Sequence, residues 1–273
     1  MSDTVADAVV DAARKALGPL GVCLPVSFTT TPSPKALRES VRRFERAGYG
    51  AVWTNEVIGK DALVQLAMLL ADTERMVFGT CIANIWARPR QTMHAAAAQL
   101  AQAFPGRFVL GIGVGYPEQA ASVGREFGRP LSTMRDYLEG MNAATWPPAP
   151  DAPYARIVAA NGPKMLALAG DLADGALPAG LPPGFTAQAR SALGPDKLVV
   201  VGLSVVRDVD EVSDQLVNSS VAQGDPANVA DNIREHLAAG ADHVTLLPPV
   251  GGEFDVLIEQ LERLGPALAG LGE

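Results

Sequence analysis

The chain has 273 residues, of which 48% are hydrophobic and 19% charged, with a mean hydropathy of +0.14. This composition is typical of a globular protein with a substantial core, and a formal net charge of -8 without a basic cluster argues against nucleic acid or an anionic membrane surface as a partner. No apolar run approaches the roughly 20 residues that a membrane-spanning helix needs.

The first 17 residues alternate acids with Ala and Val, which predicts a short helix and lacks the basic start and long apolar stretch of a signal peptide. Cys23 and Cys81 stand far apart within apolar runs. With three histidines and no C-x-x-C motif, the sequence predicts neither a disulfide framework nor a zinc site. We therefore expect a reducing, cytoplasmic setting and no bound metal.

Nearly continuous apolar runs recur along the chain and predict parallel strands that are covered on both sides. They lie at 20–26, 50–54, 76–83, 107–114, 155–160, 175–178, 198–206 and 242–247.

Amphipathic segments between these runs predict helices. Ser33-Pro34 and Asp225-Pro226 each combine a helix cap with a first-turn proline. The other helices are expected at 61–71, 90–103, 131–144, 163–172, 184–192 and from 254 onward.

The alternation of eight strands with eight helices favours one α/β domain over residues 1–273, folded as a (β/α)8 TIM barrel. Three stretches, 45–53, 170–178 and 237–248, each pass from the end of a helix directly into an apolar strand, which is the joint of such a unit. An open doubly wound sheet is the alternative, because it shares these local signals. The proline-rich stretch 145–153 and residues 208–224, which have little apolar periodicity, fall where a barrel places its working loops.

Polar residues that follow the strands are the functional candidates, because TIM barrels bind ligands at the carboxyl ends of their strands. His94, His236 and His243 fall on helices or at a strand start, so we expect helix-surface or packing roles for them. The candidates are Asn55 and Glu56 after the second strand, Asn84, Trp86 and Arg88 after the third, Tyr116 and Glu118 after the fourth, and Asn161, Gly162 and Lys164 after the fifth.

Glu56 is the best acid or base candidate among them. A carboxylate in a barrel mouth is partly desolvated, which favours its protonated form and allows it to exchange a proton. The alternative is that Glu56 pairs with Lys60 or Arg88 and tethers a loop.

The run VLGIGVGYPE at 109–118 has its glycines at a period of two, so it fits a strand and not the G-x-G-x-x-G phosphate loop. Either a flat ligand lies against Gly111, Gly113 and Gly115, or these glycines relieve crowding in a packed interior. The run AANGPKM at 159–165 ends a strand and opens a helix, which makes an anion site suited to a phosphate, or simply an efficient turn with a solvated lysine.

Several segments taken together resemble the luciferase-like monooxygenase superfamily, and within it the oxidoreductases that use the deazaflavin coenzyme F420. They are TNEVIGKDAL (54–63), FGTCIANIWARPRQTMHAAAAQLAQAFPGRFVLGIGVG (78–115), GREFGRPLSTMRDYLEGM (124–141), AANGPKMLALAGDLADGALP (159–178) and QGDPANVADNIREHLAAGADHV (223–244).

The resemblance implies a barrel of the bacterial luciferase-like type that binds a deazaflavin or flavin at its mouth. It implies a bulge with an unusual peptide behind the ring at the third strand, space beside the ring at the fourth-strand glycines, and a phosphate site after the fifth strand. The cofactor-binding residues it implies are Asn55, Thr80, Cys81, Ile82, Ala83, Gly111, Gly113, Gly115, Asn161, Gly162, Pro163 and Lys164, with Glu56 beside them as the catalytic residue.

Two loops depart from the family pattern, because the segments TWPPAPDAPYARI and RDVDEVSDQLVNSSVA are short where relatives carry longer insertions that wall the pocket. Three functions therefore stay open: an F420-dependent oxidoreductase acting by hydride transfer on a small organic substrate, an FMN-dependent monooxygenase, and a non-catalytic protein with a degenerate cofactor pocket. The Ala-rich helix at 93–104 could pair two copies into a homodimer or pack closely on its own barrel.

Overall fold

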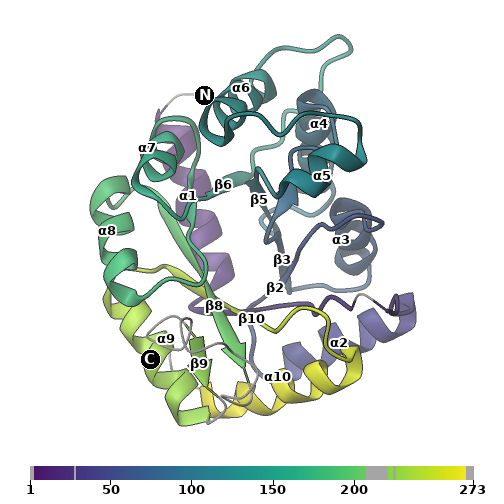
Figure 1. Ribbon diagram of the computed structural model, residues 1–273, viewed down its shortest axis with the longest axis vertical. Coiled ribbons are helices and arrows are strands. Elements are labelled where there is room, and N and C mark those ends of the chain that lie inside the picture. Colours follow the sequence, from purple (N-terminus) through teal and green to yellow (C-terminus); the bar gives the residue numbers. More distant parts are fainter. Residues whose placement is uncertain (1–2, 28, 207–220, 224–225, 269–273) are drawn as a thin grey trace.

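A computed structural model describes residues 3–27, 29–206, 221–223 and 226–268 (Figure 1). Eight parallel strands form a closed barrel, because β10 pairs with β8 on one side and with β1 on the other. The predicted TIM barrel is therefore confirmed and the open sheet is excluded. In barrel order the strands are β1 (Leu20–Cys23), β2 (Ala51–Thr54), β3 (Val77–Thr80), β5 (Phe108–Gly113), β6 (Ala155–Ala159), β7 (Gly175–Leu177), β8 (Leu198–Val206) and β10 (His243–Leu247).

Two short strands extend this barrel. β4 (Ala83–Asn84) follows β3 after a break of two residues and pairs with β5. β9 (Val221–Gln223) pairs with the carboxyl end of β8. The contracted segment after β8 that the sequence singles out lies, at 207–220, outside the described residues.

Helices surround the barrel, and each predicted helix is present (Figure 1). Ser33 caps α2 by accepting a hydrogen bond from the backbone N–H of Ala36 at 3.1 Å, as its position before Pro34 predicts. None of the described helices is long and apolar enough to cross a bilayer. The helices are α1 (Asp3–Leu17), α2 (Pro34–Arg46), α3 (Ala62–Ala71), α4 (Arg90–Ala103), α5 (Pro117–Ser122), α6 (Pro130–Met141), α7 (Pro163–Leu172), α8 (Pro183–Leu193), α9 (Pro226–Ala238) and α10 (Phe254–Leu268).

The Ala-rich helix α4 packs on its own barrel. Its small residues Ala97, Ala98 and Ala101 are buried, and α4 lies against α3, α6 and β5. Small side chains let a helix approach the strands closely, so this packing accounts for the alanines without a second copy of the chain.

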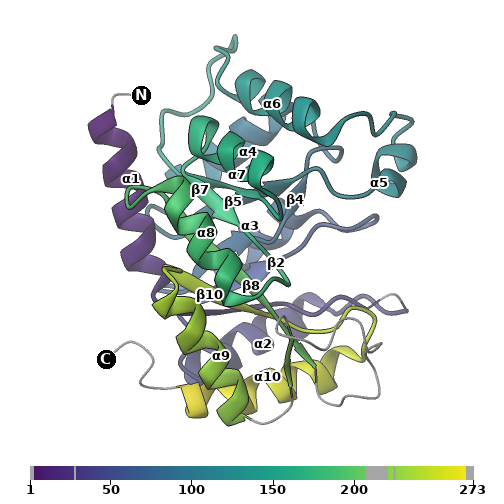
Figure 2. The same cartoon turned by 60° about the vertical axis from the view of Figure 1, so that its left-hand side comes forward.

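The base of the barrel, at the amino ends of its strands, is closed by α1, which lies at the opposite end from α5 (Figure 2). Val10 and Leu17 of α1 are buried against the residues that fill the barrel interior. Arg14 fastens this helix, because its Nε donates to Asp242 at 2.9 Å and one of its terminal nitrogens donates to the carbonyl of Pro195 at 2.9 Å.

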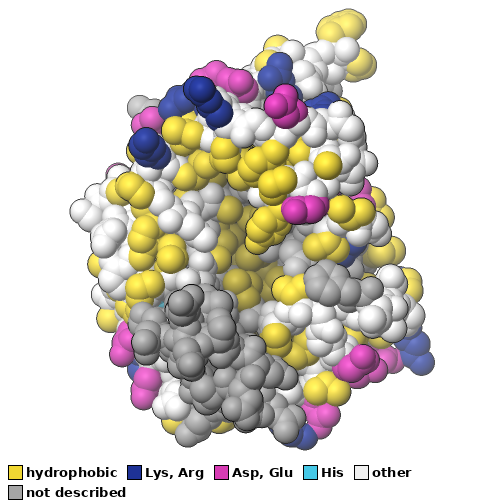
Figure 3. All heavy atoms as spheres, viewed as in Figure 1, with side chains coloured by type: hydrophobic (Ala, Val, Ile, Leu, Met, Phe, Trp, Pro, Cys, Tyr) yellow, Lys and Arg dark blue, Asp and Glu magenta, His cyan; other side chains and the backbone are white. Residues whose placement is uncertain are grey.

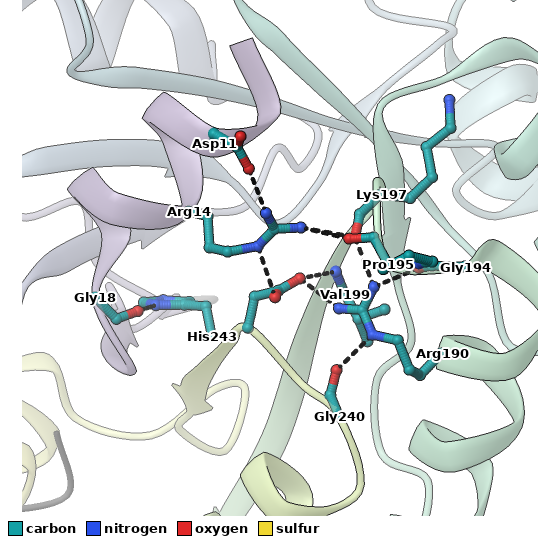
Figure 4. Close-up of polar contacts among 11 residues, drawn as sticks. Asp11, Arg14, Gly18, Arg190, Gly194, Pro195, Lys197, Val199, Gly240 and His243 are labelled. Carbon is teal, nitrogen blue, oxygen red and sulfur yellow. Dashed lines mark hydrogen bonds and ion pairs between the residues drawn. The ribbon is translucent and has the colours of Figure 1, made fainter. Parts of the chain in front are cut away.

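Asp242 joins three parts of the chain at this base through Arg14, Arg190 and Val199, and Figure 4 shows these three partners side by side. Besides Arg14, its carboxylate accepts from Arg190 of α8 at 2.6 Å and from the backbone N–H of Val199 in β8 at 2.8 Å. Arg190 also donates to the carbonyls of Gly194 and Lys197, each at 2.7 Å. The base is thus held by a connected polar network in addition to apolar packing.

The middle of the barrel interior is filled by Trp53, whose Nε1–H donates to Nε2 of His243 at 3.0 Å. The Nδ1 of His243 lies 2.7 Å from the carbonyl of Gly18, so the ring is neutral with its hydrogen on Nδ1. Burial lowers the pKa of His243 to about 4. At Gly79 an added Cβ would lie 2.3 Å from the Trp53 ring, so this glycine admits the indole. The predicted packing role of His243 is confirmed.

The other two histidines also make structural contacts. Nδ1 of His94 lies 2.8 Å from the hydroxyl of Tyr154, and Nδ1 of His236 lies 2.8 Å from the hydroxyl of Thr186. Burial lowers the pKa of both rings. Neither histidine lies at the barrel mouth.

Candidate functional site

The carboxyl ends of the strands open onto a hollow whose bottom is hydrophobic (Figure 3). The lower barrel interior is packed, but four side chains at its upper end are only partly buried, and they lie against the interior cluster. They are Cys81, Ile82, Ala179 and Leu247. This apolar floor suits a flat, weakly polar ligand better than a charged one.

The floor includes a break between β3 and β4. The peptide bond between Cys81 and Ile82 is cis, which is the unusual peptide expected at this position. Thr80 and Ala83 on either side of the break are fully buried, so their side chains do not reach the hollow. Of the four residues that the resemblance implies here, Cys81 and Ile82 are the ones available to a ligand.

Thr80 forms two hydrogen bonds with Gly111 on the neighbouring strand, β5. Its hydroxyl donates to the carbonyl of Gly111 at 2.6 Å and accepts from the N–H of the same residue at 2.9 Å. A Cβ on Gly111 would lie 2.0 Å from the carbonyl oxygen of Thr80. The space on the side of Gly111 that a Cβ would occupy is therefore filled by backbone, which matches the alternative that this glycine relieves crowding between strands. A role for Gly111 beside a ring stays a prediction.

The other two glycines of the run have separate roles. A Cβ on Gly113 would lie 3.0 Å from the side chain of Ile82, so Gly113 makes room for a residue of the floor. Gly115 has a φ of +60° and sits beside Gln119, whose Oε1 accepts from the N–H of Tyr116 at 2.9 Å. It therefore belongs to the turn that starts α5.

Glu56 is buried and all its hydrogen-bonding positions are engaged. Its Oε1 accepts from Arg88 at 2.6 Å and from the N–H of Ala62 at 3.0 Å, and its Oε2 accepts from Arg88 at 2.9 Å and from the N–H of Asn84 at 3.0 Å. Arg88 also pairs with Asp61 at 2.5 Å. Burial opposes the charged guanidinium, but its hydrogen bonds to Glu56 and Asp61 raise the pKa of Arg88. This geometry matches the loop-tether alternative.

Lys60 lines a cavity at the mouth, although the sequence did not identify it as a site residue. Its Nζ donates to Oδ1 of Asn55 at 3.2 Å, and burial lowers its pKa even though Cys23 and Glu56 act in the opposite direction. With Glu56, Arg88 and Gln119 it lines a cavity of about 330 Å³ between the loops that follow β2 and β4. The sequence offered no signal for this, because a lone lysine in a polar loop is usually solvated.

The turn after β6 keeps the features predicted for an anion site. The side chain of Asn161 holds the turn by accepting from the N–H of Ala179 at 3.0 Å and donating to its carbonyl at 3.2 Å. Gly162 caps α7, Pro163 opens it and Lys164 is exposed in its first turn. A Cβ on Gly162 would meet nothing within 4 Å, so the approach to the free N–H groups of this helix start is open.

Two environments of different chemistry thus lie after the strands, an apolar floor and an open helix start, and a ligand with a tricyclic ring and a phosphate-bearing tail needs one of each. The apolar floor offers contact for a ring, and the open start of α7 with Lys164 offers donors of the kind that bind phosphate. In the part of the chain that the structure describes, no group of three or more His, Cys, Asp or Glu side chains could hold a metal ion.

Comparison with known proteins agrees with this reading. The sequence model of the luciferase-like monooxygenase family matches residues 19–194. A protein of Mycobacterium tuberculosis named as a coenzyme F420-dependent oxidoreductase is 29% identical over 189 residues, which are 57% of this chain and 54% of that protein. The chain therefore spans about half the length of this relative.

Solved structures share the fold at low sequence identity. An F420-dependent secondary alcohol dehydrogenase, solved with an F420-acetone adduct, superimposes with a TM-score of 0.74 at 16% identity, over 92% of this chain and 99% of the other. The oxygenating component of 3,6-diketocamphane monooxygenase from Pseudomonas putida, solved with FMN, gives 0.69 at 12% identity, over 94% and 98%.

Proposed function

Because the chain belongs to the luciferase-like monooxygenase family, we propose that it is an F420-dependent oxidoreductase that transfers a hydride to or from a small organic substrate. The observation that carries the proposal is the pairing of an apolar floor at the barrel mouth with an open helix start at α7. A ring and a phosphate need these two environments, and the described loops bring them to one end of the barrel. The F420-dependent relative supports the choice of cofactor.

In this proposal Cys81 and Ile82 support one face of the ring, and Gly162 and Lys164 hold the phosphate. The bound deazaflavin supplies a carbon, C5, that accepts or donates a hydride. Asn55 is fixed by Lys60 and presents an amide at the rim. The apolar side chains of the floor keep water from the reacting atoms and so strengthen every polar contact there.

The proton that accompanies the hydride needs a donor, and Glu56 is the residue proposed for it. The carboxylate of Glu56 accepts four hydrogen bonds within the protein. At least one of them has to break before Glu56 can donate a proton to a ligand. Glu56→Gln separates the two roles. A catalytic Glu56 predicts lost turnover with unchanged cofactor affinity, whereas a tether predicts lower stability of the fold.

The cofactor is tested by titrating the purified protein separately with F420 and with FMN, following absorbance and fluorescence. Saturable binding of F420 without FMN supports the proposal. Binding of FMN alone overturns it in favour of a flavin monooxygenase, the alternative suggested by the FMN-bound structural neighbour. Binding of neither favours a non-catalytic protein with a degenerate pocket.

A further inference from the structure

Lys60 is a partly buried cation without an ion-pair partner. Its ammonium donates to Oδ1 of Asn55 at 3.2 Å, and no carboxylate among the described residues forms an ion pair with it. The two carboxylates that line the same cavity, Glu56 and Asp61, are both bound by Arg88. Burial lowers the pKa of Lys60, because the ammonium loses water without gaining a paired anion. A negatively charged ligand group beside Lys60 would therefore gain a charge-assisted contact.

Asn55 offers a second donor next to this ammonium. Its Oδ1 accepts from Lys60, whereas its amide N–H groups form no hydrogen bond with any residue that the structure describes. The oxygen and the nitrogen belong to the same amide group, so the free N–H groups lie close to the ammonium. Two neighbouring donors of this kind match the two oxygens of a carboxylate.

The side chain of Asn55 turns toward the apolar floor. Trp53 points into the barrel interior, and Thr54 points outward, where its hydroxyl donates to Gln65 of α3 at 2.6 Å. Strand pairing continues beyond this point, because the N–H of Cys81 donates to the carbonyl of Thr54 at 2.7 Å. Since successive residues of a strand alternate in direction, Asn55 faces inward, and the donor pair lies at the edge of the floor.

The cavity beside Lys60 has room and apolar walls for the rest of a small ligand. Its volume of about 330 Å³ is near the lower end of the size range of small-molecule sites. Ile58, in the loop after β2, and Val123, at the end of α5, both line it and are 64% and 48% exposed. Neighbouring apolar side chains that the fold leaves uncovered are a common mark of a binding site.

The charges around the cavity favour a ligand with one negative charge. Arg88 neutralises the buried Glu56, but Asp61, whose side chain is 47% exposed, shares the same guanidinium. A phosphate dianion would be repelled by this second carboxylate and would have one ammonium to hold it. A carboxylate brings a single charge and two acceptor oxygens, which is what the donor pair can satisfy.

We propose that Lys60 and Asn55 form a subsite that binds the carboxylate of a small organic acid, with the apolar body of the acid against Ile58 and Val123. The identification of this acid as the substrate rests on the proposed function, in which the subsite anchors it at the edge of the floor. Binding of the acid needs no cofactor, so the subsite and the proposed function can fail separately.

The test titrates the purified protein, without cofactor, with benzoate and separately with benzamide, and measures binding by calorimetry. The two probes have nearly the same shape, but benzamide carries no charge. We expect saturable binding of benzoate about tenfold tighter than that of benzamide. Equal affinities, or no binding of benzoate, would overturn the subsite even if F420 binds, whereas benzoate binding without F420 binding would leave the subsite standing and remove the proposed function.

Variants locate the carboxylate, with circular dichroism to confirm that each is folded. Lys60→Met should weaken benzoate binding about tenfold and leave benzamide binding unchanged. Asn55→Asp keeps the shape of the side chain but gives Lys60 an anionic partner within the protein, so it should weaken benzoate binding at least as much. Unchanged benzoate affinity in either variant contradicts the proposal.

Lys164→Met is the matched control, because it removes an exposed lysine at the start of α7. It should leave benzoate binding unchanged. A loss of benzoate affinity in this variant equal to that in Lys60→Met would overturn a subsite specific to Lys60.

Discussion

Arg88 binds both carboxylate oxygens of Glu56 in a buried ion pair, with N–O distances of 2.6 and 2.9 Å. The pair joins the loop after β2 to the loop after β4, and these loops line the cavity at the rim of the mouth. The positions of these two loops therefore depend on the buried ion pair between Arg88 and Glu56.

Glu56→Gln should destabilise the fold. Removing one charge of a buried pair leaves the other unsatisfied, at a cost of about 3 kcal/mol, although Asp61 remains as a second partner of Arg88. The free energy of unfolding from urea denaturation measures this, with Glu118→Gln, an exposed acid on α5, as a control that should change little. Unchanged stability with lost turnover would favour a catalytic role for Glu56 instead.

Protonation of His243 should couple stability to pH. Because the folded-state pKa is about 4 and the usual value is 6.5, the unfolded chain binds the proton more readily. Stability from this group is complete above pH 6.5 and is lost as pH falls toward 4, with a loss of about 2 kcal/mol by pH 5.

Urea denaturation at pH 7 and pH 5 measures this dependence. His243→Gln offers an amide oxygen to Trp53 but does not titrate, so the variant should lose less stability over the same interval. An unchanged pH dependence in the variant would assign the effect to other groups.

Asp242→Asn should weaken the base of the barrel. The carboxylate accepts from Arg14, Arg190 and the backbone of Val199, and an amide cannot replace all three contacts. Since the partners are partly exposed, we expect a loss of about 2 kcal/mol, below the cost for a fully buried pair. Thermal unfolding measures this loss, with Asp231→Asn as the control. Asp231 forms an exposed ion pair with Arg234 on α9, so its substitution should have almost no effect.

Lys164→Met should weaken binding of a phosphate-bearing cofactor about tenfold, or ~1.4 kcal/mol, by removing one charged donor at the start of α7. Lys35→Met is the matched control, because Lys35 likewise follows a first-turn proline, in α2. Equal effects of both substitutions on the titration would argue against a phosphate site at α7.

The oligomeric state remains a prediction that a light-scattering mass would test. The buried alanines of α4 give no reason for pairing, because their own barrel already covers them.

The barrel was predictable because its strands are continuous apolar runs and its helices begin with clear caps such as Ser33. Helix α5 was missed, since six residues are too few to display a helical period. The sequence could not decide between the two roles considered for Gly111, because the group that it accommodates, the carbonyl of Thr80, belongs to another strand.

Asp242 directly precedes β10, whereas Cys81 and Ile82 directly follow β3, so the polar network and the apolar floor lie at opposite ends of the parallel barrel strands. A protein engineer can therefore treat them as separate modules. Substitutions at the base can be used to raise tolerance to heat or denaturant, while libraries at the mouth explore new substrates, because the effects of substitutions at distant positions without shared partners add.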